Sequence, residues 1–205
     1  MPNISTHINF LRILKNKYFN ELDINFLTLG SIAPNYYVIF NDTNKSCLSH
    51  FKEDSSEKCN LTKFRLNLSN KKLNYLEKSF AMGYYTHLWL DNYFDENIER
   101  FFISKSNIET YGSHVILNEN IKNYDIKLII DFISKINIID SSFKDFLPIK
   151  LNKSINIFND FKYKCLNKNF NTACPIIITE NDYIRFINVC SNVFLKEFNR
   201  ETIIK

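Results

Sequence analysis

The chain has 205 residues, a length that fits one domain, and 45% of them are hydrophobic, which is ample for a core. Three Gly and four Pro are too few for a fold rich in tight turns or for a glycine-rich nucleotide loop. The net charge of +4 comes from scattered lysines rather than a basic stripe with interleaved aromatics, so we expect no nucleic-acid partner.

In the first half, the sequence predicts a helix over 5–18 capped by Ser5 and a helix over 24–32 that ends before Pro34. A helical turn or short extended run over 36–40 and a short helix over 47–52 follow. A loop over 54–60 then precedes a long helix over 73–102. The long helix is the strongest of these, because it contains no Pro and a single Gly. We expect Gly83 to allow close helix packing, and Gly30 to allow a close approach near the candidate site.

The predicted elements of the second half are a loop or frayed helix over 104–113, a helix over about 115–136, another from about 142, a weakly patterned Asn-rich stretch over 152–171, a segment over 175–178 that could be extended, and a final helix capped by Thr179. Helical spacing dominates, so we expect an all-α fold. It is predicted to be a single-domain helical bundle over 1–205, with a motif-bearing part at about 4–125 and C-terminal helices at about 140–205.

The five cysteines include no CxxC pair, so they do not indicate a disulfide framework. The N-terminus lacks a basic region followed by an apolar run, and no segment reaches ~18 consecutive apolar residues. We therefore expect neither a secretory signal nor a membrane span. The expected compartment is a reducing cytoplasm, in which most of the cysteines are thiols that fill the core.

The best candidate for chemistry is the pair His87 and Asp91, four residues apart in the long helix. That spacing places both side chains on one helix face, where an imidazole and a carboxylate can bind one divalent ion. Taken alone, such a pair more often makes a simple hydrogen bond or ion pair on the helix face. However, apolar neighbours predict burial, and a buried carboxylate needs a partner. His7 and His50 also stand in apolar segments, which favours one shared site.

Four pieces of sequence, in this order, carry a resemblance to a known family: Thr6-His7, LGSIAPN at 29–35, SHF at 49–51 and FAMGYYTHLWLD at 80–91. They resemble the zinc-dependent phospholipase C superfamily, which also includes related nucleases and many uncharacterised bacterial proteins. The resemblance covers about residues 4–100 and depends on the order and spacing of all four pieces. It implies an all-helical fold with up to three zinc ions that hydrolyse phosphodiesters.

The resemblance makes His50, His87 and Asp91 ligands of one metal, with a fourth ligand at Asn35. The family motif has an aspartate at that place, and the neutral amide of Asn35 is a weaker zinc ligand that cannot act as a base. Asp42 could substitute for the missing carboxylate. Asp91 could bridge two metals or orient a water molecule. Asp91 and Asn35 are therefore the catalytic candidates.

His7 resembles an N-terminal histidine that helps to hold another metal in the family, and His114 is the one histidine left for a third metal. One or two zinc ions are thus expected, with Mn or Fe as alternatives. The aromatic residues Tyr36, Tyr84 and Trp89 fit either core packing or the wall of a substrate pocket.

A divalent metal lowers the pKa of a bound water from ~15.7 to about 7 and so activates it for hydrolysis. The leading hypothesis is a metal-dependent hydrolase of a small phosphoester, ester or amide. One alternative is a biosynthetic tailoring enzyme that uses the metal to activate an amide or peptide. Another is a binding protein that kept the scaffold and lost catalysis. The partner expected is a small molecule, and the sequence does not indicate an oligomeric state.

Overall fold

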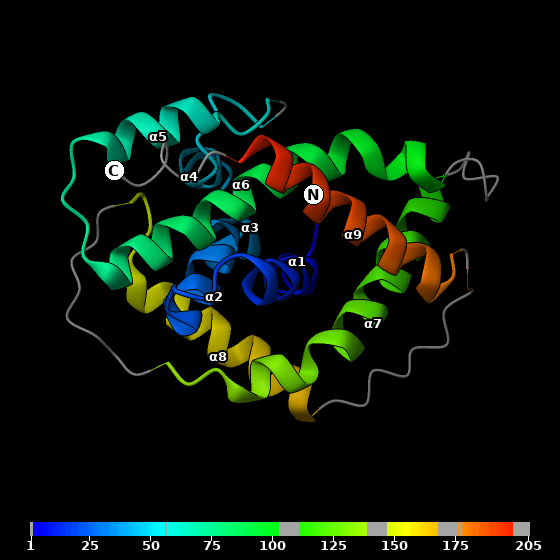
Figure 1. Ribbon diagram of the computed structural model, residues 1–205. Helices are drawn as coiled ribbons and strands as arrows, with labels where there is room; N and C mark the ends of the chain where they lie inside the picture. The colour runs from blue at the N-terminus through cyan, green and yellow to red at the C-terminus, as the bar shows by residue number, and fades with distance from the viewer. Residues whose placement is uncertain are drawn as a thin grey trace.

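The computed structural model describes residues 2–55, 57–102, 111–138, 147–167, 176 and 178–198, and every regular element in these ranges is helical (Figure 1). The elements are α1 (Ile4–Lys17), α2 (Ile24–Ile32), the 3₁₀ helix η1 (Ala33–Asn35), α3 (Tyr36–Ile39), α4 (Thr43–Ser49), α5 (Leu61–Ser69), α6 (Tyr75–Phe102), α7 (Tyr111–Lys135), α8 (Leu151–Asn167) and α9 (Glu180–Glu197). The predicted all-α class is confirmed for these residues, while the likeness to the phospholipase C fold and the single-domain organisation stay predictions.

Helix α1 lies in the middle of the molecule, with α2, α6, α7 and α9 packed around it (Figure 1). Its N-cap is Asn3, whose side-chain oxygen accepts a hydrogen bond from the amide of Thr6 at 3.1 Å. The predicted cap, Ser5, is wrong, because Ser5 lies in the first turn and donates its hydroxyl to Asn3. Almost all of the first eight residues of α1 are buried, and they include His7. The polar residues of α1 are therefore held inside the fold.

Two glycines allow the backbones of α2 and α6 to touch. A Cβ atom on Gly30 would lie 2.0 Å from the carbonyl oxygen of Phe80, and one on Gly83 would lie 1.9 Å from the carbonyl oxygen of Leu27. The predicted packing roles of both glycines are thus confirmed. Because His87 follows Gly83 by about one turn, the crossing also carries its side chain up to α2.

The helix boundaries depart from the predictions in several places. Helix α4 begins at Thr43 rather than at residue 47, because Asp42 caps it by accepting from the amide of Lys45. The stretch 61–69 forms α5, for which we predicted no element, and the Asn-rich stretch beginning at residue 152 lies in α8. Thr179 caps α9 as predicted. The predictions for 104–110, for the helix start near 142 and for most of 175–178 lie outside the described residues.

The buried carboxylate of Asp125 joins helices α1, α7 and α9. Asp125 of α7 accepts hydrogen bonds from the Thr6 hydroxyl at 2.6 Å, from the Asn9 amide at 2.8 Å and from the Tyr183 hydroxyl at 2.5 Å. Thr6 and Asn9 belong to α1, and Tyr183 belongs to α9. Burial nevertheless raises the pKa of Asp125 to about 7, since these donors only partly replace lost water.

This raised pKa predicts a pH-dependent contribution to stability. The ordinary pKa is 3.8, so between about pH 4 and pH 7 the folded chain holds a proton on Asp125 that the unfolded chain has lost. The contribution is complete below about pH 4 and is lost as the pH rises through about 7. Asp125→Asn removes this dependence. The free energy of unfolding of the variant relative to wild type should therefore rise by on the order of a few kcal/mol from pH 4 to pH 8.

Chemical denaturation across this pH range measures the difference. The buried histidines titrate in both proteins, so their contribution cancels in the comparison. A difference that stays constant from pH 4 to pH 8 would contradict the assignment.

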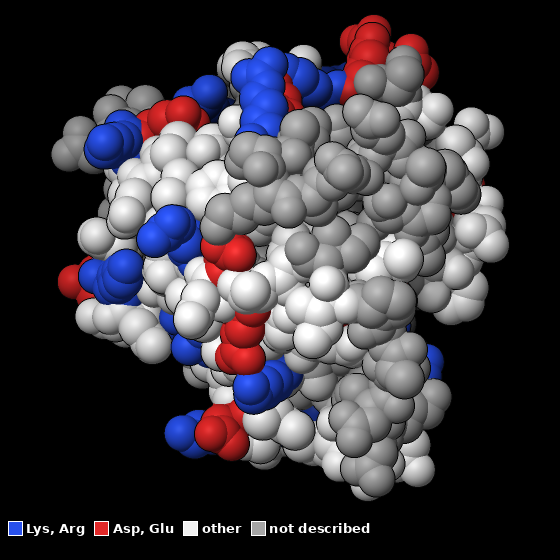
Figure 2. Space-filling model, turned by 90° about the vertical axis from the view of Figure 1, so that its right-hand side faces the viewer, with Lys and Arg blue, Asp and Glu red and all other residues white. Residues whose placement is uncertain are grey.

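The surface carries charges of both signs. On the face that Figure 2 shows, Lys and Arg side chains lie near Asp and Glu side chains rather than in one continuous basic area. Several lysines elsewhere on the helices pair with carboxylates, as Lys127 does with Glu180 at 2.7 Å and Lys164 with Asp160 at 2.5 Å. Within the described ranges, no helix has both the length and the apolar character needed to cross a bilayer.

Candidate metal centre

Four side chains that are far apart in the sequence meet inside the fold. His7 comes from α1, His50 follows the last turn of α4, and His87 and Asp91 lie one turn apart on α6. The carboxylate of Asp91 is at their centre. Its Oδ1 lies 3.3 Å from Nε2 of His7, and its Oδ2 lies 3.5 Å from Nε2 of His50 and 3.6 Å from Nε2 of His87. All four residues are at most 1% exposed.

Three of these donor atoms have the spacing of a tetrahedral zinc site. Nε2 of His50 and Nε2 of His87 lie 3.3 Å apart, which completes a triangle with Oδ2 of Asp91. Ligands at about 2.0–2.1 Å from a tetrahedral zinc are separated from one another by about 3.3 Å. The donor atoms of His7, His87 and Asp91 also lie within 4.8 Å of one another. This buried His–His–Asp cluster could therefore hold a metal ion.

The backbone fixes which nitrogen of each ring faces the cluster. Nδ1 of His87 lies 2.8 Å from the carbonyl oxygen of Ser31, and Nδ1 of His50 lies 2.8 Å from the carbonyl oxygen of Ser46. A carbonyl can only accept, so each Nδ1 carries the proton and each Nε2 presents a lone pair to the centre. This is the arrangement by which metal-binding histidines are commonly oriented in proteins.

On the other side of Asp91, several buried polar atoms have no hydrogen-bond partner among the described residues. Both ring nitrogens of His7 and Oδ1 of Asp91 are buried without a hydrogen-bond partner among the described residues. The His7 Nε2 to Asp91 Oδ1 contact at 3.3 Å is close enough for an ion pair but is not aligned as a hydrogen bond. The His7 ring instead stacks on the His87 ring, with 3.7 Å between centroids. Buried polar atoms without partners are costly, which favours a bound cation here.

The ionisation states also suit a cation. Burial lowers the pKa of His7 to about 3 and that of His50 to about 4, so both imidazoles are neutral near pH 7. Burial alone would raise the pKa of Asp91, but the neighbouring imidazoles of His87 and His7 hold it well below its ordinary value. The site thus combines the neutral imidazoles of His7 and His50 with an ionised carboxylate, the protonation states that a metal requires of its ligands.

No family model, curated protein or solved structure matches this chain.

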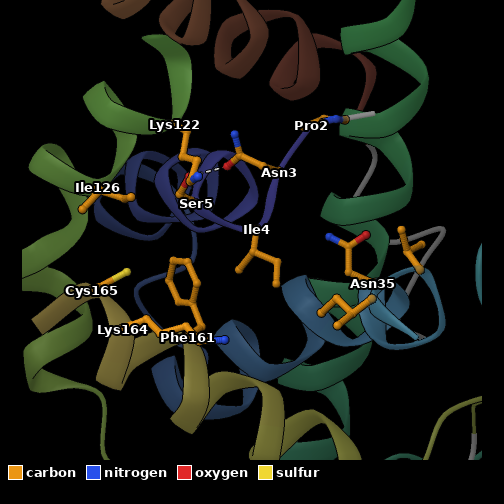
Figure 3. Close-up of a pocket in the computed structure, with 12 residues that line it drawn as sticks. Pro2, Asn3, Ile4, Ser5, Asn35, Lys122, Ile126, Phe161, Lys164 and Cys165 are labelled. Carbon is orange, nitrogen blue, oxygen red and sulfur yellow. Dashed lines mark hydrogen bonds between the residues drawn. The ribbon is translucent and has the colours of Figure 1, made fainter. Parts of the chain in front are cut away.

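Asn35, the predicted fourth ligand, lines a cavity of about 530 Å³. The cavity is mostly apolar, and Ile4, Phe161 and Ile126 contribute to its wall together with Lys122 (Figure 3). Asn35 is 4% exposed, and its side chain makes no capping hydrogen bond at the start of α3. The cavity also reaches the first turn of α1, one turn before His7. It therefore connects the position of Asn35 with the helix that supplies His7.

Asp42 does not take the place of a fourth ligand. Its carboxylate caps α4 and pairs with Nζ of Lys45 at 2.7 Å, on the partly exposed surface. The hydrogen bonds from Lys45 lower the pKa of Asp42. The suggested substitution is wrong, because this carboxylate is already used at the helix N-terminus.

The predicted pocket residues have different locations. Tyr84 is fully buried, where it stacks on Phe64 and donates its hydroxyl to the carbonyl of Ser49. Trp89 is 5% exposed and donates its indole N–H to Glu197 at 2.9 Å. Both belong to the core rather than to the described cavity lining. Tyr36 is partly exposed, with the Lys153 ammonium 4.7 Å above its ring. The predicted ligand His114 lies in α7, but its side chain is outside the described part.

Sequence reasoning missed one residue beside the cluster. Most of the cysteines were expected to fill the core, yet the sulfur of Cys59 lies 3.9 Å from Oδ2 of Asp91. No motif marks it, since it lies 28 residues from His87 in an otherwise ordinary loop. The odd cysteine count is a weak signal, and the sequence around Cys59, SSEKCNLTK at 55–63, is polar.

Proposed function

We propose that this chain is a metal-dependent hydrolase that acts on a small phosphoester, ester or amide. The observation that carries the proposal is the convergence of His7, His50, His87 and Asp91 on one buried point at the spacing of metal ligands. The ordered sequence resemblance to zinc-dependent phospholipases C supports the same reading. Zinc is the proposed ion, because imidazole and carboxylate ligands in tetrahedral spacing suit it.

Each side chain of the cluster has a role in this proposal. His50 and His87 hold the ion through Nε2, and Asp91 contributes Oδ2 while Oδ1 stays directed toward His7. His7 would bind a second ion or hold the attacking water from that side. When bound, the metal activates water and stabilises negative charge that develops on the substrate. The neighbouring apolar cavity would accommodate the body of a small substrate.

Metal content and hydrolysis test this proposal together. Protein purified without chelators should contain about one or two equivalents of zinc, and chelation should remove any hydrolysis of phosphodiester, carboxylic ester and amide probes. Added Zn, Mn or Fe should restore it. Protein that stays below one equivalent after each metal has been added would refute the proposal.

A second function is favoured by one specific observation, the amide of Asn35 where the resembled family has a carboxylate. A binding protein that retains the metal without catalysis would fit this residue. It would bind zinc stoichiometrically and hydrolyse none of the probes, whereas Asn35→Asp would then create activity. If the chain is instead a biosynthetic enzyme that modifies an amide or peptide, the substitution Asn35→Asp should abolish its native activity.

A further inference from the structure

The strongest feature that the proposed function leaves unused is the thiol of Cys59. It is 3% exposed and lies between α4 and α5 in the chain, next to the cluster. Its sulfur is 3.9 Å from Oδ2 of Asp91, the carboxylate oxygen that faces His50 and His87. A sulfur and an oxygen that share a tetrahedral zinc are about 3.5 Å apart, given bond lengths of about 2.3 and 2.0 Å. The observed sulfur–oxygen distance thus exceeds that of a shared zinc by a few tenths of an ångström.

The position of Cys59 is fixed by the same helix that carries the ligands. Asn92, the residue after Asp91, accepts a hydrogen bond from the Cys59 amide at 2.8 Å and donates one to the Cys59 carbonyl at 2.9 Å. Both hydrogen-bonding groups of the Cys59 backbone are thus bound to one side-chain amide of α6. Because Asp91 and Asn92 are adjacent, this clamp holds the thiol at a fixed place relative to the carboxylate.

A second anion would also balance the charge of a divalent ion at the site. His50 and His87 are neutral ligands, Asp91 supplies one negative charge, and Asn35 supplies none. A divalent ion on these groups alone would leave a net positive charge in a site that is at most 4% exposed, which is costly. A thiolate from Cys59 would make the site neutral, and it is a preferred zinc ligand.

We propose that Cys59 is the fourth protein ligand of the metal held by His50, His87 and Asp91. This inference rests on the proposed function. Binding breaks the S–H bond of Cys59, forms a sulfur–metal bond and releases the proton to solvent. This ion would then have four protein ligands and a structural role, so the ion that activates water would be a second one, held from the His7 side of Asp91.

Cobalt substitution tests the sulfur ligand directly, without reference to activity. Wild-type protein loaded with Co(II) should show the visible bands of tetrahedral cobalt and a near-ultraviolet thiolate-to-cobalt charge-transfer band. Cys59→Ser should lose the charge-transfer band and bind zinc at least about 100-fold more weakly. Cys190→Ser is the matched control, because Cys190 is also fully buried but lies in α9; it should keep both properties.

The outcomes separate this inference from the proposed function. Visible cobalt bands without a charge-transfer band in the wild type would overturn the role of Cys59 and leave the metal centre standing. A charge-transfer band that persists in Cys59→Ser would do the same. A wild-type chain that binds neither Co(II) nor Zn would overturn both. The wild-type spectrum decides the matter even if Cys59→Ser does not fold.

Discussion

Asp91→Asn is expected to abolish the stabilisation that zinc gives to the folded chain. Both carboxylate oxygens of Asp91 face ring nitrogens, and it is the central anion of the cluster. Zinc at about a thousandfold excess over its dissociation constant should stabilise the wild type by about 4 kcal/mol. The variant keeps the size of the side chain but loses its charge, so zinc should stabilise it by less than about 1 kcal/mol.

Thermal unfolding with and without zinc gives this comparison, and Asp125→Asn is its control. Asp125 is also a fully buried aspartate, but its partners are Thr6, Asn9 and Tyr183 rather than the cluster. The Asp125 variant should therefore retain the full zinc effect. An equal zinc effect in both variants would show that the ion binds elsewhere.

Gly83→Ala is expected to cost the fold about 3 kcal/mol or more, although alanine favours helices over glycine by about 1 kcal/mol. The new Cβ atom would lie 1.9 Å from the carbonyl oxygen of Leu27 and 2.9 Å from the amide nitrogen of Ser31. Both neighbours are backbone atoms, so α2 and α6 must separate. That movement also pulls the Ser31 carbonyl away from His87, and zinc affinity should fall with stability.

Denaturant unfolding and zinc titration of the variant measure the two effects. Glu96→Ala is the control on the same helix, because Glu96 is exposed and its pairing with Lys58 is a surface contact. It should change the free energy of unfolding by less than about 0.5 kcal/mol. A Gly83→Ala protein as stable as wild type would contradict the close crossing.

The long helices could be predicted because their apolar residues repeat at helical spacing. The bounds of α2 agree with the prediction, and α6 begins two residues later than expected. The cap of α1 could not be chosen from the sequence, since Asn3 and Ser5 both have cap-forming side chains and stand two residues apart. Helix α5 buries only Phe64 and Leu68, a single apolar pair that is too short to give a clear period.

Helix α8 could not be predicted from the sequence for a different reason. Its Asn residues have weak helix preference, and its buried face consists of Leu151, Ser154, Ile157, Phe158 and Cys165. Packing against the core overrides the weak local preference in such a segment.

The cluster could be predicted in part because His87 and Asp91 share one helix face. His7 and His50 were joined to them through apolar context and resemblance, and the fold brings all four together. Cys59 could not be found in this way, since its approach to Asp91 depends on the hydrogen bonds from Asn92 to a loop. Similarly, the core positions of Tyr84 and Trp89 follow from the packing of α5 and α9, which spacing along α6 does not reveal.

Anomalous diffraction at the zinc edge, from crystals grown with zinc, addresses the metal centre most directly. We predict one strong peak within about 2.0–2.2 Å of Nε2 of His50, Nε2 of His87 and a carboxylate oxygen of Asp91. A map without a peak among these three atoms, from protein saturated with zinc, would contradict the metal centre and with it the proposed hydrolase.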